Sequence, residues 1–205
     1  MGLKTFKGGV HPYEGKELAK DAPIKEVLPK GELVFPVSQH IGAPATPIVA
    51  VGDAVLKGQK IAEAGGFVSS PIYSSVSGTV KAIEPRRVAV GDMVNSIVIE
   101  SDGEFKEVPF TPVDDVTSLS KEEIIGKVKE AGVVGMGGAG FPTHVKLSPK
   151  EPEKIEYIIA NCAECEPYLT ADYRRMLENP EELVAGMKII LQLFDNAKGV
   201  FGVEN

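Results

Sequence analysis

The pattern of hydrophobic and polar positions divides the chain into two parts. Through residue 115, short apolar segments alternate with glycines, prolines and Gly-Asp pairs, which is typical of short strands joined by turns. These segments are GELVFPV (31–37), TPIVAV (46–51), QKIAEA (59–64), GTVKAIE (78–84) and NSIVIES (95–101). VAVGDAV (49–55) and VAVGDMV (88–94) nearly repeat, which predicts two similar strand-turn-strand halves. The pattern therefore predicts an all-β domain over residues 1–115.

A helical pattern begins after the proline-containing linker PFTPVDDVTS (109–118). Ser120 and Glu123 have the spacing of a capping box, and Gly132 is a plausible helix stop. The rest reads as a loop, a strand at KIEYIIAN (154–161), two helices and the start of another strand. This order predicts the beginning of an α/β domain over residues 116–205. Because two strands cannot bury both faces of a parallel sheet, we expect a fragment of a longer protein, cut inside its second domain.

Composition and charge exclude several functions. The 205 residues include no apolar run near the ~18–20 needed to span a bilayer, and the polar N-terminus has no signal core. The net charge is −7 with no marked basic cluster, which argues against nucleic-acid binding. Cys162 and Cys165 form a lone pair, too few for a four-ligand zinc or iron–sulfur site, so no metal site is predicted. We expect a soluble, cytoplasmic chain.

The stretch GVVGMGGAGFPTHVK (132–146) contains G-x-G-x-x-G at Gly135, Gly137 and Gly140. A dinucleotide-binding loop must follow a strand and open a helix, whereas here a capped helix precedes and Phe-Pro-Thr follows. A flexible turn is one alternative. The other is a different cradle, in which backbone N–H groups and Lys146 hold a phosphate and Phe141 offers a stacking face.

The first part resembles the barrel-sandwich hybrid of biotinyl and lipoyl domains. The resemblance lies in G-D-x-V-x-x-G-Q at 52–59, SGTV at 77–80 and G-D-x-V at 91–94. Gly66, within EAGGF, stands where those carriers have their modified lysine. The resemblance therefore implies a carrier-like fold without carrier chemistry, serving as a scaffold or docking surface.

The second part resembles the flavoprotein subunit of respiratory complex I. GMGGAGFPTHVK (135–146) is similar to that family's flavin loop, and NCAECEP (161–167) is similar to its N-A-D-E-G-E-P turn. Met136 and Ala163 depart from that pattern, which has arginine and aspartate there. FKGGVHP (6–12) and QHIGAPATPIVAVGDAVLKGQ (39–59) narrow the resemblance to the C subunit of the Rnf (Rsx) ferredoxin:NAD oxidoreductase.

This resemblance implies bound FMN and NAD(H). The FMN residues it implies are Gly135, Gly137, Gly138, Lys146, Asn161 and Glu164. NAD(H) would lie near Phe141 and Glu166, and no residue is assigned to catalysis. Two 4Fe–4S clusters belong to the full-length family, but their cysteines are absent from this chain.

The implied function is electron transfer between NAD(H), FMN and iron–sulfur clusters, coupled to ion translocation. The implied partners are the membrane subunits of the complex and ferredoxin, with the chain bound peripherally at the cytoplasmic face of the cell membrane. A non-catalytic docking module and a flavin-dependent corrin reductase are the alternatives. The histidines, including His40, receive no role from the sequence.

Overall fold

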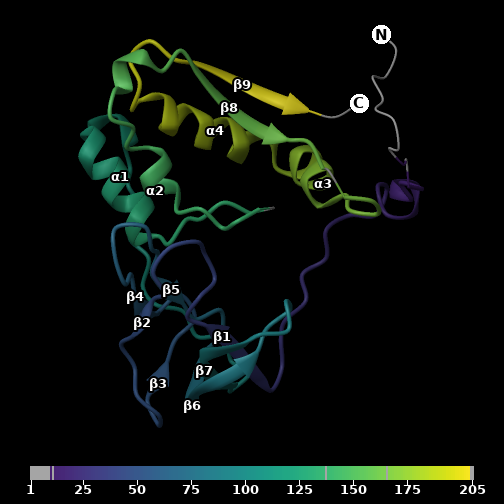
Figure 1. Ribbon diagram of the computed structural model, residues 1–205, viewed down its shortest axis with the longest axis vertical. Helices are drawn as coiled ribbons and strands as arrows, with labels where there is room; N and C mark the ends of the chain where they lie inside the picture. Colours follow the sequence, from purple (N-terminus) through teal and green to yellow (C-terminus); the bar gives the residue numbers. More distant parts are fainter. Residues whose placement is uncertain (1–9, 11, 137, 165, 204–205) are drawn as a thin grey trace. The chain divides into compact units, whose positions relative to one another are not determined.

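The computed structural model describes residues 10, 12–136, 138–164 and 166–203, which form two compact units. One unit is the continuous segment 27–154, and the other combines the N-terminal segment up to residue 26 with residues 155–205. Figure 1 shows the chain coloured along the sequence. The first unit contains the β-rich part together with the helix and glycine loop that follow it. The boundary expected between residues 115 and 116 stays a prediction.

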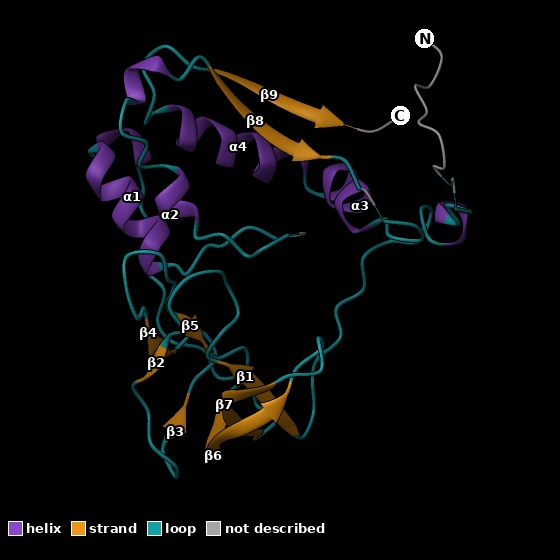
Figure 2. Cartoon of the chain, viewed as in Figure 1, coloured by secondary structure: helices purple, strands orange, loops and turns teal. Residues whose placement is uncertain are grey.

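The β-rich part of the first unit contains two antiparallel sheets (Figure 2). The strands are β1 (Glu32–Pro36), β2 (Thr46–Pro47), β3 (Ala54–Val55), β4 (Lys60–Glu63), β5 (Ile72–Tyr73), β6 (Gly78–Arg87) and β7 (Met93–Ser101). One sheet has the order β1-β7-β6-β3 and the other β2-β4-β5. Strands of both sheets contribute to one hydrophobic core, which includes Phe35, Val55, Ile61, Ile72, Val80 and Ile97. This architecture confirms the predicted barrel-sandwich hybrid.

The near-repeat predicted from the sequence forms two comparable turns. Gly52 and Gly91 have φ values of 96° and 95°, which non-glycine residues rarely adopt. Each is followed by an aspartate and then by the first residue of a strand, β3 or β7. The repeat therefore marks two places where a glycine reverses the chain before a strand.

The hairpin that holds the modified lysine in carrier domains is packed against the neighbouring backbone here. The Ser69 hydroxyl donates to the Ala43 carbonyl at 2.8 Å and accepts from the Gly65 N–H at 2.9 Å. A Cβ added at Gly65 would lie 2.1 Å from the Pro44 carbonyl oxygen, so the two segments are in close contact. Gly66 supplies no amine, and its segment is held to residues 43–44.

Helix α1 (Lys121–Glu130) connects the strand-rich part to the glycine loop. It follows the short 3-10 helix η2 (Val116–Ser118) and begins with both hydrogen bonds of the predicted Ser120–Glu123 capping box. At its end, Gly132 has a φ of 67°, and the N–H groups of Gly132 and Val133 bond to the carbonyls of Lys129 and Val128. This is a Schellman ending, as the glycine predicts.

The second unit contains a two-stranded parallel sheet and two helices. These elements are β8 (Tyr157–Cys162), α3 (Ala171–Glu178), α4 (Pro180–Leu191) and β9 (Lys198–Val203), together with the N-terminal 3-10 helix η1 (Lys16–Leu18). Pro180 opens α4 as predicted, but the side chain of Asn179 makes no capping hydrogen bond. The 3-10 helix η3 (Pro152–Lys154) ends the first unit, just before this one begins.

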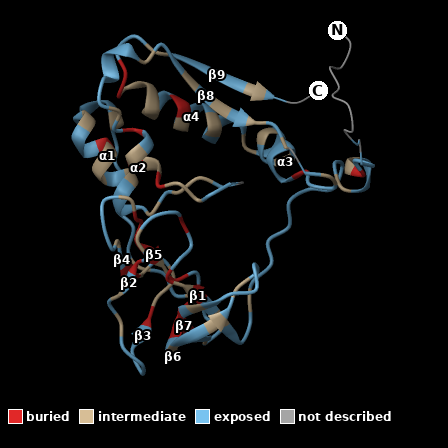
Figure 3. Ribbon diagram, in the orientation of Figure 1, coloured by how far each residue is buried: buried red, intermediate tan, exposed pale blue. Residues whose placement is uncertain are grey.

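Helix α4 covers one face of the β8–β9 pair. A Cβ added at Gly199 would lie 2.9 Å from the Met187 side chain, so helix and strand are closely packed. Met187 and Phe194 are buried, whereas Ile159 and Val200, paired across the two strands, are 67% and 40% exposed (Figure 3). The pair thus has one covered and one open apolar face. No helix in the described part of the chain has the length and apolar character to cross a membrane.

Candidate functional site

The glycine loop is a hairpin closed at its base. Val134 and Pro142 form an antiparallel bridge, and the Gly135 N–H donates to the Phe141 carbonyl at 2.9 Å. The Thr143 N–H donates to the Val133 carbonyl at 3.0 Å, and Pro142 is fully buried. The loop comes directly after α1 and ends in the four-residue helix α2 (Thr143–Lys146). A strand before the loop and a long helix after it are both lacking in these described segments, so the dinucleotide-binding interpretation does not fit.

The glycines of the loop serve different purposes. Gly140 has a φ of 62°, and an added Cβ would lie 2.9 Å from the Gln39 carbonyl oxygen, so packing and conformation both require glycine. A Cβ at Gly138 would meet nothing within 4 Å. Gly137 lies outside the described residues. The described surroundings therefore leave Gly138 open to close approach by a ligand.

Lys146 lies beside Gly135 of the same loop. A Cβ added at Gly135 would be 3.1 Å from the Lys146 Nζ atom. The Lys146 residue is exposed and its ammonium has no ion-pair partner among the described side chains. A free ammonium next to a glycine backbone is suited to an anionic phosphate, where charge-assisted hydrogen bonds are strong.

A cavity of ≈ 620 Å³ adjoins the loop. The loop contributes Val134, Gly135, Met136, Gly138, Ala139 and Gly140 to its lining, and the barrel-sandwich part contributes Ser38, Gln39, His40 and Ile41. A second cavity, of ≈ 550 Å³, shares Gln39, His40 and Val134 with the first. Both volumes fall in the range of about 300–1,000 Å³ that small-molecule and cofactor sites occupy.

The residues present fit FMN. The open backbone at Gly138 and the ammonium of Lys146 suit the phosphate, and Phe141 at the base of the loop is half-buried. Ile41 and Met136, which are 47% and 86% exposed, give the cavity an apolar surface for a flat ring. When bound, FMN supplies the chemistry of exchanging a hydride on one side for single electrons on the other.

An ion pair connects the barrel-sandwich part to the helix before the loop. Lys60 on β4 lies 2.6 Å from the carboxylate of Glu130, the last residue of α1. Their hydrogen bond raises the pKa of Lys60 and lowers the pKa of Glu130 below its ordinary value. Tyr73 donates its hydroxyl to the main-chain carbonyl of the same Glu130. These contacts fix the end of α1 from which the loop begins.

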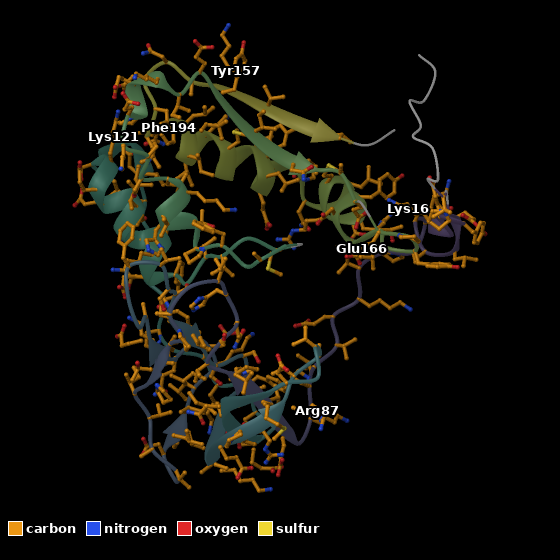
Figure 4. All side chains as sticks on the ribbon, in the orientation of Figure 1. Lys16, Arg87, Lys121, Tyr157, Glu166 and Phe194 are labelled. Carbon is orange, nitrogen blue, oxygen red and sulfur yellow. The ribbon has the colours of Figure 1, made fainter. Side chains whose placement is uncertain are left out.

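The predicted N-x-x-E-x-E-P residues belong to the other unit. Asn161, near the end of β8, is exposed, and its side-chain oxygen accepts from the Ala163 N–H at 3.2 Å. The Glu164 carboxylate accepts from the N–H groups of Asp172 and Tyr173 at 3.0 and 3.3 Å. Glu164 therefore caps the N-terminus of α3, a structural role that the motif did not reveal. Glu166 is exposed (Figure 4).

An N-terminal segment, Tyr13–Lys16, packs against this turn and is hydrogen-bonded to it, and we call this segment the N-terminal strap. The Lys16 ammonium donates to the Glu164 carbonyl at 2.7 Å, and the Tyr168 N–H donates to the Glu14 carbonyl at 2.6 Å. The rings of Tyr13 and Tyr168 meet edge to face at 6.2 Å. Gly15 is the sequence signal that could have indicated such a close approach, since a Cβ there would lie 2.3 Å from the Tyr168 ring.

The predicted site residues thus divide between the two units. Gly135, Gly138, Phe141 and Lys146 lie in segment 27–154, whereas Asn161, Glu164 and Glu166 lie in the other unit. Cys162 is a free, half-buried cysteine whose sulfur is 3.6 Å from the Ala160 carbonyl oxygen, and Cys165 lies outside the described residues. Three His, Cys, Asp or Glu side chains suited to one metal ion do not come together anywhere in the described part.

Comparison with known families agrees with both parts of the chain. Residues 4–104 match the RnfC barrel sandwich hybrid domain, and residues 128–205 match the Nuo51 FMN-binding domain. These matches define a class, an FMN-domain protein with a barrel-sandwich domain before it. The chain is similar in its first part to RnfC proteins, and along nearly its whole length to C subunits of ferredoxin:NAD+ oxidoreductase complexes.

Curated relatives match along nearly the whole chain. The C subunit of the proton-translocating ferredoxin:NAD+ oxidoreductase complex of Clostridium ljungdahlii is 48% identical over 205 residues, which is 99% of this chain and 45% of the relative. Its Na+-translocating counterpart from Acetobacterium woodii is 45% identical over 98% of this chain and 46% of the relative. The C subunit of the ion-translocating oxidoreductase complex of Haemophilus influenzae (strain PittEE) is 36% identical over 99% of this chain and 31% of the relative. The chain thus spans less than half the length of these relatives.

Proposed function

We propose that this chain is part of the electron-transfer subunit of a membrane-associated, ion-translocating ferredoxin:NAD oxidoreductase. The observation that carries the proposal is the glycine hairpin with the Lys146 ammonium beside Gly135, at the edge of a cavity, in a region that matches an FMN-binding domain. The names of the relatives supply the reaction and the complex.

The residues of the hairpin would hold FMN by its phosphate and its ring. Backbone N–H groups at Gly137 and Gly138 and the ammonium of Lys146 would bind the phosphate. Because the Gly135 N–H is bonded to the Phe141 carbonyl, the proposed contribution of Gly135 is to let the Lys146 ammonium lie close to the backbone. Asn161 would contact the flavin from the turn after β8. Since the Glu164 carboxylate is engaged at the start of α3, its proposed contribution is to shape that turn.

NAD(H) would bind near Phe141 and Glu166, with the carboxylate facing ribose hydroxyls because it would repel a phosphate. The electrons would continue to two 4Fe–4S clusters, whose cysteines this chain does not contain. The proposed partners are the membrane subunits of the complex and ferredoxin, with the protein bound peripherally at the cytoplasmic face of the membrane.

A docking role for the barrel-sandwich part is a second candidate. It is favoured by the hairpin around Gly66, which has no lysine to modify, is hydrogen-bonded to Ala43 and packs against Pro44. In this version the domain would bind a membrane subunit without taking part in electron transfer. The two roles are compatible, since they concern different surfaces.

Anaerobic titration of the purified intact protein with NADH tests the electron-transfer proposal. The expected result is a flavin absorption spectrum that bleaches as NADH is added. A protein that purifies without flavin, and that neither binds added FMN nor oxidises NADH in its presence, would leave the docking role alone.

A further inference from the structure

The segment Ser38–Ile41 of the barrel-sandwich part lies directly against the glycine loop. The Ile41 N–H donates to the Ala139 carbonyl at 3.0 Å. A Cβ added at Gly140 would be 2.9 Å from the Gln39 carbonyl oxygen and 3.1 Å from the His40 Cα atom. The two backbones therefore touch, and a hydrogen bond fixes how they meet.

The same segment is anchored on its other side to the barrel-sandwich core. His40 is 8% exposed, and its Nε2 accepts the Ser70 N–H at 3.1 Å, while Nδ1 lies 3.2 Å from the Ile41 carbonyl oxygen, to which it can donate. One residue beyond Gly42, the Ala43 N–H bonds to the Val68 carbonyl at 2.9 Å. The buried side chain of His40 thus fixes the position of residues 38–41, against which the glycine loop packs.

Segment and loop together line the ≈ 620 Å³ cavity, which is open to solvent. Ile41 lines it from the barrel-sandwich side and Met136 from the loop side. Both are large apolar side chains, yet they are 47% and 86% exposed. Gly135 also lines the cavity, and the Lys146 ammonium lies beside Gly135, so a charged group is close to this apolar surface.

We propose that Ser38–Ile41 is the second wall of the flavin cradle, with Ile41 packing against the isoalloxazine ring while the loop and Lys146 take the phosphate. The inference rests on the proposed FMN site and adds to it residues from outside the region matched to the FMN-binding domain, which begins at residue 128. In this arrangement the barrel-sandwich domain is part of the cofactor site. A flat apolar ring with an anionic tail is the ligand whose chemistry suits both sides of the cavity.

The test compares two isoleucines in the intact protein. Ile41→Ser removes the proposed ring contact but keeps the backbone hydrogen bond to Ala139. Ile48→Ser is the matched control, because Ile48 is 51% exposed, also donates its N–H to a backbone carbonyl, and lies outside the cavity lining. Both proteins are stripped of flavin, and the FMN dissociation constant is measured by quenching of flavin fluorescence.

Ile41→Ser is expected to weaken FMN binding by about tenfold, since a largely buried isoleucine contact contributes about 1.5 kcal/mol. Ile48→Ser should bind FMN as the unchanged protein does, and Ile41→Leu should keep most of the affinity. Thermal unfolding of each flavin-free protein shows whether the fold is intact.

Equal affinities of the two serine variants would overturn the inference while leaving the FMN site standing. If Ile41→Ser unfolds, Ile41→Ala decides, with Ile41→Leu as its control, and an FMN affinity unchanged in Ile41→Ala would also overturn the inference. If the unchanged protein binds no FMN, the proposed function fails, and the second wall fails with it.

Discussion

The ammonium of Lys16 lies 2.7 Å from the main-chain carbonyl oxygen of Glu164, and it donates a hydrogen bond to it. This contact joins residues that are 148 positions apart. Together with the bond from the Tyr168 N–H to the Glu14 carbonyl, it fastens the start of the described chain to the turn that carries Asn161, Glu164 and Glu166. The N-terminal segment therefore helps to set the shape of that turn.

Gly15→Ala should loosen this strap. Gly15 has a φ of 62°, and the new Cβ would overlap the Tyr168 ring at 2.3 Å. We expect backbone strain of about 1–2 kcal/mol plus the displacement of the ring. Native-state hydrogen exchange at the Tyr168 amide, the donor to Glu14, should become at least several-fold faster.

Gly31→Ala is the control that separates the effect of backbone strain from the effect of steric overlap with a neighbouring side chain. Gly31 has a similar φ of 72°, but a Cβ there would meet nothing within 4 Å. Exchange at the Tyr168 amide should stay unchanged in this variant. Equal protection of Tyr168 in both variants would show that Gly15 does not hold the strap.

Alanine substitutions at Gly140 and Gly138 should distinguish a glycine needed for stability from a glycine needed for FMN binding. Gly140→Ala should lower the melting temperature, because φ is 62° and the Gln39 carbonyl oxygen leaves no room. Gly138→Ala should leave the melting temperature of the flavin-free protein unchanged, because the site is open, but should weaken FMN binding. Calorimetry without flavin and an FMN titration measure the two effects. Unchanged FMN affinity in Gly138→Ala would remove that residue from the cradle.

The Lys60–Glu130 pair should make stability depend on pH. Its hydrogen bond lowers the pKa of Glu130, so its contribution is present above the ordinary carboxyl value of 4.5 and is lost as pH falls through the lowered value. The raised pKa of Lys60 means that its contribution is complete below 10.5 and is lost as pH rises through the raised value. The pair therefore stabilises the protein between these limits.

Glu130→Gln tests this dependence. Since the Glu130 side chain is 63% exposed, solvent screening limits the loss to about 0.5 kcal/mol at neutral pH. Thermal unfolding should show the variant less stable at neutral pH and equal to the unchanged protein in acid, below the folded-state pKa of Glu130. A difference that persists undiminished into that acid range would contradict the ion-pair explanation.

Local sequence patterns correctly predicted those structural features that depend only on residues close together in the chain. The Ser120–Glu123 capping box and the Gly132 ending formed as expected, because each depends on backbone groups within one helical turn. The glycine repeat around Gly52 and Gly91 was readable for the same reason, since a positive φ is a property of a single residue. The similarity to the RnfC barrel sandwich hybrid domain and to the Nuo51 FMN-binding domain was also readable, from the motifs.

Contacts between segments far apart in the chain could not be predicted from the sequence. The bond of Ile41 to Ala139, the burial of His40 against Ser70 and the strap of Glu14 on Tyr168 each join residues far apart in sequence. The Glu164 carboxylate also differs from what the motif suggests, because its capping partners depend on where α3 begins. A sequence motif gives the residue types and their spacing, whereas the contacts of each side chain depend on the three-dimensional fold.

Lys146 is the residue on which the central proposal most depends. FMN titration of the flavin-free intact protein should show Lys146→Ala binding FMN at least about tenfold more weakly, the loss of one charge-assisted contact to phosphate. Lys150→Ala is the control, since Lys150 is an exposed lysine four residues away. Riboflavin, which lacks the phosphate, should bind equally to both variants. An FMN affinity unchanged by Lys146→Ala would contradict the account of this loop as a phosphate-binding flavin cradle.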